Sequence, residues 1–221
     1  MSTVLITGAN RGIGLEFCRQ LQARGDAVVA VCRTPSPELE QLGVRIEAGL
    51  DLTDAGSGEE LRRRLGDLSL DVLIHNAGRL EADSLNSVEA DGLRRQFEVN
   101  AVAPLLLSRA LLPLLHPGSK LVLITSRMGS IADNGSGGYY GYRMSKTALC
   151  MAGKSLAIDL APRGIAVVIL HPGMVSTRMT GFTSSGISPE TSVRGLLQRI
   201  EELTPASSGQ FRHANGEELP W

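Results

Sequence analysis

An alternation of short apolar runs with segments of helix length is the feature that most restricts how this 221-residue chain can fold. The runs are rich in Val, Ile and Leu and show little polar alternation, as strands do when both faces are buried. Six such runs are TVLIT, AVVAVC, VRIEA, LDVLIH, KLVLIT and IAVVIL. Strands of this kind form a parallel sheet with helices on both faces, so the sequence predicts a doubly wound α/β fold.

The segments between the runs have the length of helices. The expected helices are Ile13–Arg24, Gly58–Leu65, Val88–Leu115, Tyr142–Ala161 and, after Pro189, Ser192–Leu203. Pro104 and Pro113 should bend or break the third of them, because proline lacks the N–H that a helix interior needs. A final strand is expected near 210–213, and no repeat or linker divides the chain. We therefore expect one domain, residues 1–221, with six or seven strands.

Composition argues against several classes of function. The net charge of −1 gives no electrostatic reason to expect nucleic acid or an anionic membrane as a partner. The longest apolar runs, such as AVAPLLL, are too short to span a bilayer, and the N-terminus lacks the pattern of a signal peptide. Three cysteines without a CxxC pair predict reduced thiols in a cytoplasmic protein, and four histidines far apart predict no metal site.

A glycine-rich turn, TGANRGIG at residues 7–14, follows the first predicted strand. Gly8 permits a tight turn, Gly12 lets the backbone approach a pyrophosphate, and Gly14 lets the next helix lie close to the sheet. The N–H groups at the start of that helix then face the phosphates of a dinucleotide. A glycine turn can also merely satisfy strand-to-helix geometry, but its place in the first strand–helix unit favours dinucleotide binding.

The end of the second predicted strand bears on which dinucleotide binds. An acidic residue there would accept hydrogen bonds from the adenosine ribose and repel a 2′-phosphate. This chain has Cys32 followed by Arg33, and Arg11 in the glycine turn adds a second cation. Both arginines could instead be solvated surface residues. The sequence favours NADP and leaves NAD as an alternative.

All three tyrosines of the chain lie within four residues, in GGYYGYRMSK at residues 137–146. Tyr142 has Lys146 four residues later, so the two side chains share one face of the predicted helix. A nearby ammonium group favours the phenolate, and we therefore expect the pKa of Tyr142 to lie below its usual value. Tyr142 is the candidate general acid and base.

The other two tyrosines are weaker candidates. Tyr139 has Arg143 at the same offset, but it lies in a glycine-flanked approach to the helix, where helical spacing is doubtful. Tyr140 has Met144 at that offset, which offers no charge. We expect both to serve as packing or substrate-wall residues.

Several motifs together resemble those of the short-chain dehydrogenases/reductases, over nearly the whole chain. They are TGANRGIG, NAG at 76–78, Asn100, Ser126, YRMSK at 142–146 and HPGMVST at 171–177. The ITSRMGSIADN and GGYYGYRMSK segments look especially like the sniffer and C-factor-like carbonyl reductases. The resemblance implies a Rossmann-like domain and an oxidoreductase that moves a hydride between NADP and a carbonyl or alcohol substrate.

The resemblance also implies a role for individual residues. Tyr142 would protonate the carbonyl oxygen, Lys146 would hold the nicotinamide ribose, and Ser126 would hydrogen-bond the substrate oxygen. Asn100 would anchor a water molecule that links Lys146 to solvent. The implied cofactor-binding set is Gly8, Asn10, Arg11, Gly12, Ile13, Gly14, Cys32, Arg33, Asp51, Leu52, Asn76, Ala77, Gly78, Tyr142, Lys146, Pro172, Gly173, Val175 and Thr177.

Some of these assignments have alternatives. Ser130 competes with Ser126, because the spacing from Ser126 to Tyr142 is longer than is common in the family, although sniffer-like members share a similar insertion. Asn100 could simply make a buried hydrogen bond to the backbone, and Asp51 could be a turn former or helix cap. Ser126, Asn76 and His171-Pro172-Gly173 all follow predicted parallel strands, where ligands bind in such sheets.

Substrate and partner are the least determined by the sequence. In the family the segment after Thr177 covers the substrate, and here residues 178–191 form a short cover that suggests an open site for bulky or varied carbonyl compounds. Met174, Met179, Phe182, Tyr139 and Tyr140 could line an apolar wall or belong to the core. The resemblance implies a homodimer through the helices at 88–115 and 142–161. The alternative function is a nucleotide-binding signalling or regulatory protein on the same scaffold.

Overall fold

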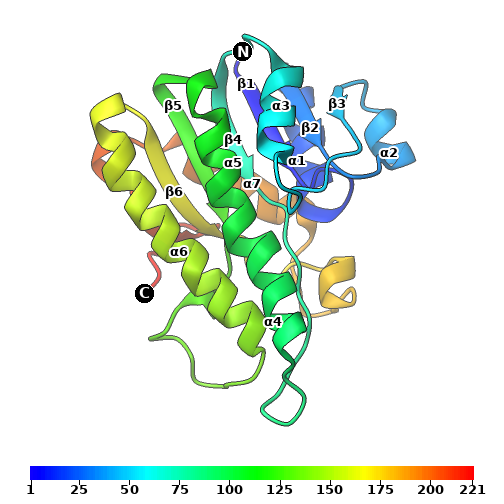
Figure 1. Ribbon diagram of the computed structural model, residues 1–221, viewed down its shortest axis with the longest axis vertical. Helices are drawn as coiled ribbons and strands as arrows, with labels where there is room; N and C mark the ends of the chain where they lie inside the picture. Colours follow the sequence, from blue (N-terminus) through cyan, green and yellow to red (C-terminus); the bar gives the residue numbers. More distant parts are fainter.

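A seven-stranded parallel sheet runs through the centre of the protein, which is described by a computed structural model of residues 1–221 (Figure 1). The strand order is β3-β2-β1-β4-β5-β6-β7, and every neighbouring pair is parallel. The strands are β1 (Thr3–Thr7), β2 (Ala27–Val31), β3 (Arg45–Glu47), β4 (Leu70–His75), β5 (Leu115–Ile124), β6 (Ala166–His171) and β7 (Gln210–His213). The predicted doubly wound α/β fold is confirmed, with seven strands.

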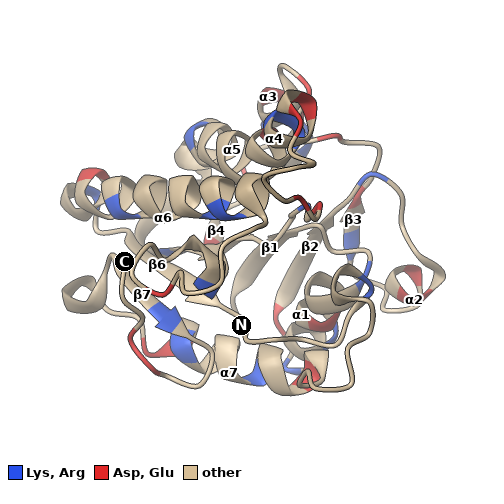
Figure 2. Ribbon diagram, turned by 90° about the horizontal axis from the view of Figure 1, so that it is seen from below, with Lys and Arg blue, Asp and Glu red and all other residues tan.

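Helices cover both faces of this sheet, as Figure 2 shows when the molecule is viewed from below. One layer contains α1 (Gly12–Ala23) and α7 (Pro189–Glu201), and the short α2 (Pro37–Glu40) lies near the β3 edge. The other layer contains α3 (Ser57–Leu65), α4 (Ala90–Phe97), α5 (Ala103–Leu111) and α6 (Tyr140–Leu160). The β1–β2 and β6–β7 connections therefore cross one face of the sheet, and the connections from β3 to β6 cross the other, as in a doubly wound sheet.

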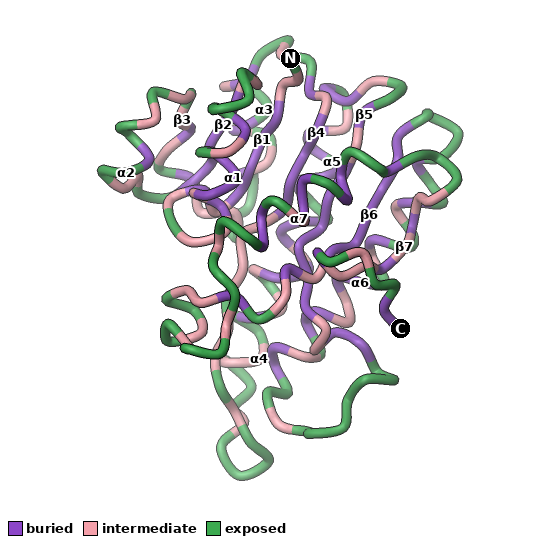
Figure 3. The backbone as a smooth tube through the Cα atoms, turned by 180° about the vertical axis from the view of Figure 1, so that it is seen from behind, coloured by how far each residue is buried: buried purple, intermediate pink, exposed green.

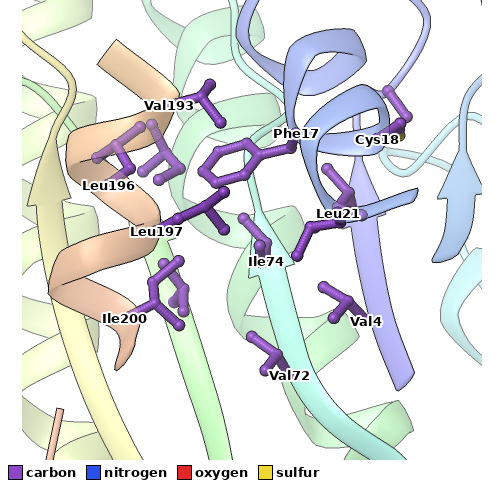
Figure 4. Close-up of a cluster of buried hydrophobic side chains, with 14 of the residues drawn as sticks. Val4, Phe17, Cys18, Leu21, Val72, Ile74, Val193, Leu196, Leu197 and Ile200 are labelled. Atoms are coloured by element: carbon purple, nitrogen blue, oxygen red, sulfur yellow. The ribbon is translucent and has the colours of Figure 1, made fainter. Parts of the chain in front are cut away.

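Each face of the sheet has its own core. Phe17 and Leu21 of α1 meet Leu196 and Leu197 of α7 above β1 and β4 (Figure 4). On the other face Leu5, Leu73 and Leu121 pack under α3 and α5. Fully burying one such side chain stabilises the fold by about 1.5–3 kcal/mol relative to exposing it. The central strands are buried, the edge strands β3 and β7 less so, and the exposed chain is concentrated in loops and helix surfaces (Figure 3).

The long helix predicted over 88–115 is divided into three parts, and a 3₁₀ turn that contains Pro113, Leu112–Leu114, follows them. Between α4 and α5 lies a π-helix, Glu98–Val102, and Pro104 stands in the first turn of α5. Proline at 104 has no N–H to donate to the carbonyl of Asn100 four residues earlier, so the regular pattern breaks there. The predicted break is confirmed, and it places Asn100 within the irregular segment.

The same helical stretch bears on the expectation that no segment could span a bilayer. Taken together, Ala90–Leu114 is 25 residues long and its most apolar 18-residue window has a mean hydropathy of 1.3, so by length and composition alone it could cross a membrane. Half of its most apolar window is buried in the fold, as in a core helix. A core helix passes the same test of length and composition, so the expectation that no segment spans a bilayer stays a prediction.

Element boundaries differ from the predictions at a few places. Helix α6 begins at Tyr140 rather than Tyr142, so Tyr142 lies in its first turn. Strand β5 begins at Leu115, ahead of the KLVLIT run, and its register with β4 shifts between Leu70 and Val72. The single turn α2, with Ser36 as its N-cap, was not predicted, because four residues carry no readable helical period.

Buried histidines should make the fold sensitive to acid. Burial lowers the pKa of His75 from 6.5 to about 3, and its Nε2 lies 2.8 Å from Ser108 Oγ. Between these pH values the unfolded chain binds a proton that the folded chain does not, so the free energy of unfolding falls as the pH drops below 6.5. His75→Gln should reduce this fall in denaturant titrations, and an unchanged pH slope would contradict the assignment.

Candidate active site

The candidate residues converge at the edge of the sheet where the parallel strands end. Gly8 follows β1, Asn76 follows β4, Ser126 follows β5 and Pro172 follows β6. The N-terminal half of α6 lies over this edge, and in Figure 1 it points towards the same loops at the bottom of the molecule. Sequence motifs that are far apart along the chain are thus brought into one region, as predicted.

Tyr142 and Lys146 both point inward from α6, and their side chains are 7% and 3% exposed. The Lys146 ammonium lies 5.8 Å from the centre of the Tyr142 ring and donates a hydrogen bond of 2.9 Å to the carbonyl oxygen of Ile124 at the end of β5. A Cβ at position 78 would lie 3.7 Å from Lys146 Nζ, which places the NAG segment against the same amine. The predicted i, i+4 pair is present.

The predicted direction of the Tyr142 pKa is wrong for this arrangement. Burial raises the pKa of Tyr142 to about 12, and the neighbouring Ser126 hydroxyl opposes this rise. Burial also lowers the pKa of Lys146 to about 8, so the amine is a weaker electrostatic partner than an exposed lysine. Helical spacing identified the neighbours, but desolvation disfavours the charged form of both groups and determines the direction of both pKa shifts.

Ser126 rather than Ser130 adjoins the phenol. Ser126 follows β5, accepts a hydrogen bond of 3.1 Å from the N–H of Met128, and lies close enough to Tyr142 to influence its pKa. The Ser130 hydroxyl instead accepts a hydrogen bond from the N–H of Asp133 and stabilises a turn. The preference for Ser126 agrees with this geometry.

The rival Tyr139–Arg143 pair does not form. Tyr139 precedes α6 with a left-handed backbone, φ 52°, so the helical i, i+4 relation does not apply to it. The Arg143 guanidinium donates to the Gly138 carbonyl and the Ser136 hydroxyl, which ties down the loop before α6. Tyr139 and Tyr140 are both partly exposed, in contrast to Tyr142.

The side chain of Asn100 is fully engaged by the protein. Its Oδ1 accepts from the N–H of Arg79 at 2.8 Å, and its Nδ2 donates to the Arg79 carbonyl and to Ser145 Oγ at 2.8 and 2.9 Å. The alternative reading, a buried asparagine bonded to backbone, therefore describes this side chain. Any water anchored by Asn100 would use its main-chain carbonyl, which Pro104 leaves without the usual helical donor.

The glycine turn has the close packing that a dinucleotide cradle needs. A Cβ at Gly14 would lie 2.2 Å from the Gly8 carbonyl oxygen and 2.6 Å from Asn76 Nδ2, so only glycine fits. Helix α1 starts with Arg11 as its N-cap and without a side-chain cap, which leaves its first N–H groups available to an anion. These features fit a bound pyrophosphate.

Thr7 joins the glycine turn to the NAG segment. Its hydroxyl accepts hydrogen bonds from the N–H groups of Asn76 and Ala77, both at 3.1 Å, and its carbonyl accepts from Asn76 Nδ2. Sequence reasoning quoted Thr7 within the motif but gave it no role. Its position after the first strand was the only signal, because the partner residues lie about seventy residues away.

At the adenosine end, Arg33 and Asp51 form an ion pair of 3.3 Å. Asp51 also accepts from the N–H and hydroxyl of Thr53, and these bonds, followed by Arg33, lower its pKa. It is thus a turn former, and its charge partly offsets that of Arg33. The Cys32 side chain is buried in the core, whereas the exposed Arg11 makes no ion pair or side-chain hydrogen bond within the chain.

Thr177, which lies in the loop after β6, approaches the glycine turn. A Cβ at Gly12 would lie 3.5 Å from Thr177 Cγ2, and the N–H of Thr177 donates to the Thr180 hydroxyl. Met174, Met179 and Phe182 nearby are 60%, 45% and 69% exposed, so the reading that they belong to the core is wrong. They form an apolar rim on the segment expected to cover the substrate.

Asp83 is a functional candidate that the sequence did not indicate. Its carboxylate accepts hydrogen bonds from the N–H groups of Tyr140 and Gly141 at the start of α6. The two partners lie 57 and 58 residues away, so no local spacing pattern could have revealed the contact.

Comparison with known proteins identifies the family. A family model described as short chain dehydrogenase matches residues 2–187. The chain is 43% identical, over the full length of both proteins, to 1-hydroxy-2-glutathionyl-2-methyl-3-butene dehydrogenase of Rhodococcus sp. (strain AD45). The chain belongs to the short-chain dehydrogenase/reductase family. It is also 45% identical to the C-signal of Myxococcus xanthus over 69% of this chain and 93% of that protein.

Solved structures agree with this membership. The carbonyl reductase Sniffer of D. melanogaster has a TM-score of 0.92 and 32% identity, with 100% of both chains covered. The NADPH-bound carbonyl reductase from chicken fatty liver has a TM-score of 0.90 and 32% identity, with 100% of this chain and 99% of that chain covered. The resemblance to sniffer and C-factor-like carbonyl reductases is confirmed, and the protein is a short-chain oxidoreductase.

Substitution at Gly14 tests the dinucleotide cradle. Gly14→Ala should lower the free energy of unfolding by about 1–3 kcal/mol, because its methyl group would overlap the Gly8 carbonyl. It should also weaken dinucleotide binding in calorimetry. Gly135→Ala is the control, because a Cβ there meets nothing within 4 Å. Equal behaviour of the two variants would contradict the proposed fit.

Proposed function

We propose that the protein is an NADP-dependent carbonyl reductase or alcohol dehydrogenase in which Tyr142 transfers the proton. The observation that carries this proposal is the buried Ser126, Tyr142 and Lys146 set at the carboxyl end of β5, beside the dinucleotide cradle. A protein that only bound nucleotides would need the cradle but would have no use for a buried phenol and amine at its edge.

A bound nicotinamide supplies the hydride for reduction or accepts it in oxidation. Gly8, Gly12 and Gly14 would hold the pyrophosphate, and Asn76–Gly78 and Thr177 would lie beside the bound cofactor. In reduction, Tyr142 donates its proton to the carbonyl oxygen, which Ser126 orients through a hydrogen bond. With a pKa of about 12 the phenol stays protonated at neutral pH, as an acid must.

Lys146 has two tasks in this proposal. It would hold the ribose hydroxyls next to the nicotinamide, and it would return a proton towards Tyr142. Its pKa of about 8 suits proton exchange near neutral pH. The Asn100 main-chain carbonyl, which Pro104 leaves without its helical donor, is where we place the water molecule that leads to solvent.

Bulky or apolar carbonyl compounds are the substrates that the site favours. Met174, Met179 and Phe182 present apolar surface on the 178–191 cover and just before it, and Tyr139 adds an exposed ring before α6. An open apolar rim would admit substrates of varied size. The Rhodococcus relative is named for a bulky glutathionyl alcohol, which agrees with a spacious entrance.

A signalling or regulatory role is the alternative function. The similarity to the C-signal of Myxococcus xanthus favours it, since a role in signalling can exist on this scaffold with or without turnover. The intact Ser126, Tyr142 and Lys146 set favours the enzyme. Cofactor consumption with a panel of aldehydes, ketones, quinones and steroids would separate the two, because a pure binding module gives none.

A homodimer in a reducing cytoplasm completes the proposal. Leu105 and Leu106 of α5 and Met144, Met151 and Ile158 of α6 are 42–68% exposed, and the three α6 residues recur at intervals of seven along one helix face. All three cysteines are free and buried, as expected of reduced thiols.

Substitution on the exposed face of α6 tests the homodimer. Met151→Glu should convert the dimer to a monomer in light scattering, and a wild-type monomer would refute this assembly.

Removal of the Tyr142 hydroxyl tests the catalytic assignment. Tyr142→Phe should lower turnover by about a hundredfold or more, because the acid is lost while the ring still packs. The NADPH dissociation constant, measured by fluorescence, should change little. Tyr140→Phe is the control. Turnover retained in Tyr142→Phe but lost on substitution of Tyr139 would transfer the role to Tyr139.

Charge reversal at Arg33 tests cofactor preference. Arg33→Asp should reduce the ratio of kcat/KM for NADPH to that for NADH by about ten- to a hundredfold, because a charge-assisted bond to the 2′-phosphate is replaced by repulsion. Arg163→Asp, at an exposed turn before β6, is the control. An unchanged ratio would reject the role of Arg33 in recognising the phosphate.

A further inference from the structure

The first turn of α6 is capped by a residue from a different part of the chain. Tyr139, at the N-cap position, makes no side-chain cap. Instead, Asp83 accepts from the N–H groups of Tyr140 and Gly141, the latter at 3.0 Å, and its own carbonyl accepts from the N–H of Tyr139 at 2.9 Å. The three successive N–H groups before Tyr142 thus all donate hydrogen bonds to Asp83.

The segment that carries Asp83 is itself fixed at two further points. Asn100 bonds both the N–H and the carbonyl of Arg79, and Gln96 Oε1 accepts from the N–H of Glu81 at 3.0 Å. Asn100 and Gln96 are fully buried. The 79–83 segment is therefore held by α4 and the π-helix, and it connects them to the start of α6.

Gly141 packs closely against both α4 and the 79–83 segment. A Cβ at this position would lie 2.3 Å from Gln96 Nε2 and 3.2 Å from Asp83 Oδ2. Gln96 Nε2 has no hydrogen-bond partner, so the amide is held there by its Oε1 bond and by packing. Any displacement of the 79–83 segment would be passed directly to the residue before Tyr142.

We propose that Asp83 is a positioning residue that fixes the Tyr142 hydroxyl relative to Ser126. Ser126 is attached to β5, whereas Tyr142 depends on the first turn of α6, and Asp83 determines where that turn lies. The inference rests on the proposed role of Tyr142 as the acid. Displacing a reacting group by about 1 Å can cost about a hundredfold in rate, whereas a lost cap costs only about 1 kcal/mol of stability.

A purely structural role for Asp83 makes a different prediction. It would lower the melting temperature without changing kcat of the folded enzyme at a temperature well below melting. Asp71 is the matched control, because it also accepts a hydrogen bond from a main-chain N–H, that of Thr3 at 2.7 Å. This contact lies at the amino-terminal ends of β1 and β4, away from the site. Asp71→Ala should reduce stability and leave kcat intact.

The experiment compares Asp83→Ala, Asp83→Asn and Gly141→Ala by steady-state kinetics with NADPH and by hydrogen exchange of residues 139–146. Asp83→Ala should lower kcat about tenfold or more, with little change in the NADPH dissociation constant and faster exchange of the first turn. Asp83→Asn should recover most of the rate, because its Oδ1 still accepts one N–H. Gly141→Ala should also lose rate, although alanine favours helices.

The kinetics of these variants distinguish failure of the positioning role from failure of the proposed function. If Tyr142→Phe remains active, the proposed function fails and takes the positioning role with it. If Tyr142→Phe is inactive while Asp83→Ala keeps wild-type kcat, or loses no more than Asp71→Ala does, the positioning role is overturned and the proposed function stands. If Asp83→Ala does not fold, the kcat of Gly141→Ala decides, and a wild-type value in that variant overturns the proposal.

Discussion

Burial of the Tyr142 phenol and the Lys146 amine against the end of β5 is the interaction on which the rest of the site depends. Removing an ammonium from water is costly unless a partner compensates, and here the Ile124 carbonyl is that partner. The pKa of Lys146 falls to about 8 and that of Tyr142 rises to about 12. Burial thus favours the neutral form of both groups and keeps the proton on the phenol.

The fold supplies this burial through three structural elements that meet at one edge. The parallel strands end together, which brings Gly8, Asn76 and Ser126 to the same side of the sheet. Pro104 interrupts the long helix and leaves Asn100 where it can bond the backbone of Arg79. Helix α6 then lies across the edge with its first turn held by Asp83. Chemistry and architecture depend on the same few contacts.

The sequence was sufficient for features that are local or repeated. Unbroken apolar runs identified the strands, the glycine turn identified the cradle, and the i, i+4 offset identified Tyr142 and Lys146 as neighbours. Each of these depends on residues close together in the chain. The sign of the Tyr142 pKa shift was not available in this way, because it depends on how deeply tertiary packing buries the phenol.

Other features of the site depend on long-range contacts. The Asp83 cap, the Arg33–Asp51 pair and the exposed rim of Met174 and Phe182 all follow from chain segments that meet only in the folded protein. A cap normally comes from the residue just before its helix, and here Tyr139 gives no such sign. Met174, Met179 and Phe182 could not be assigned to core or surface from hydrophobicity alone, since apolar residues are common in both.

The most direct test of this account is a titration of the Tyr142 phenol in the dinucleotide-free protein. The phenolate absorbance of wild-type protein minus that of Tyr142→Phe isolates the one buried tyrosine. We predict that its signal develops only well above pH 10, with a midpoint at about 12. A midpoint near neutral pH would contradict the claim that burial, rather than attraction to Lys146, determines the protonation of this group.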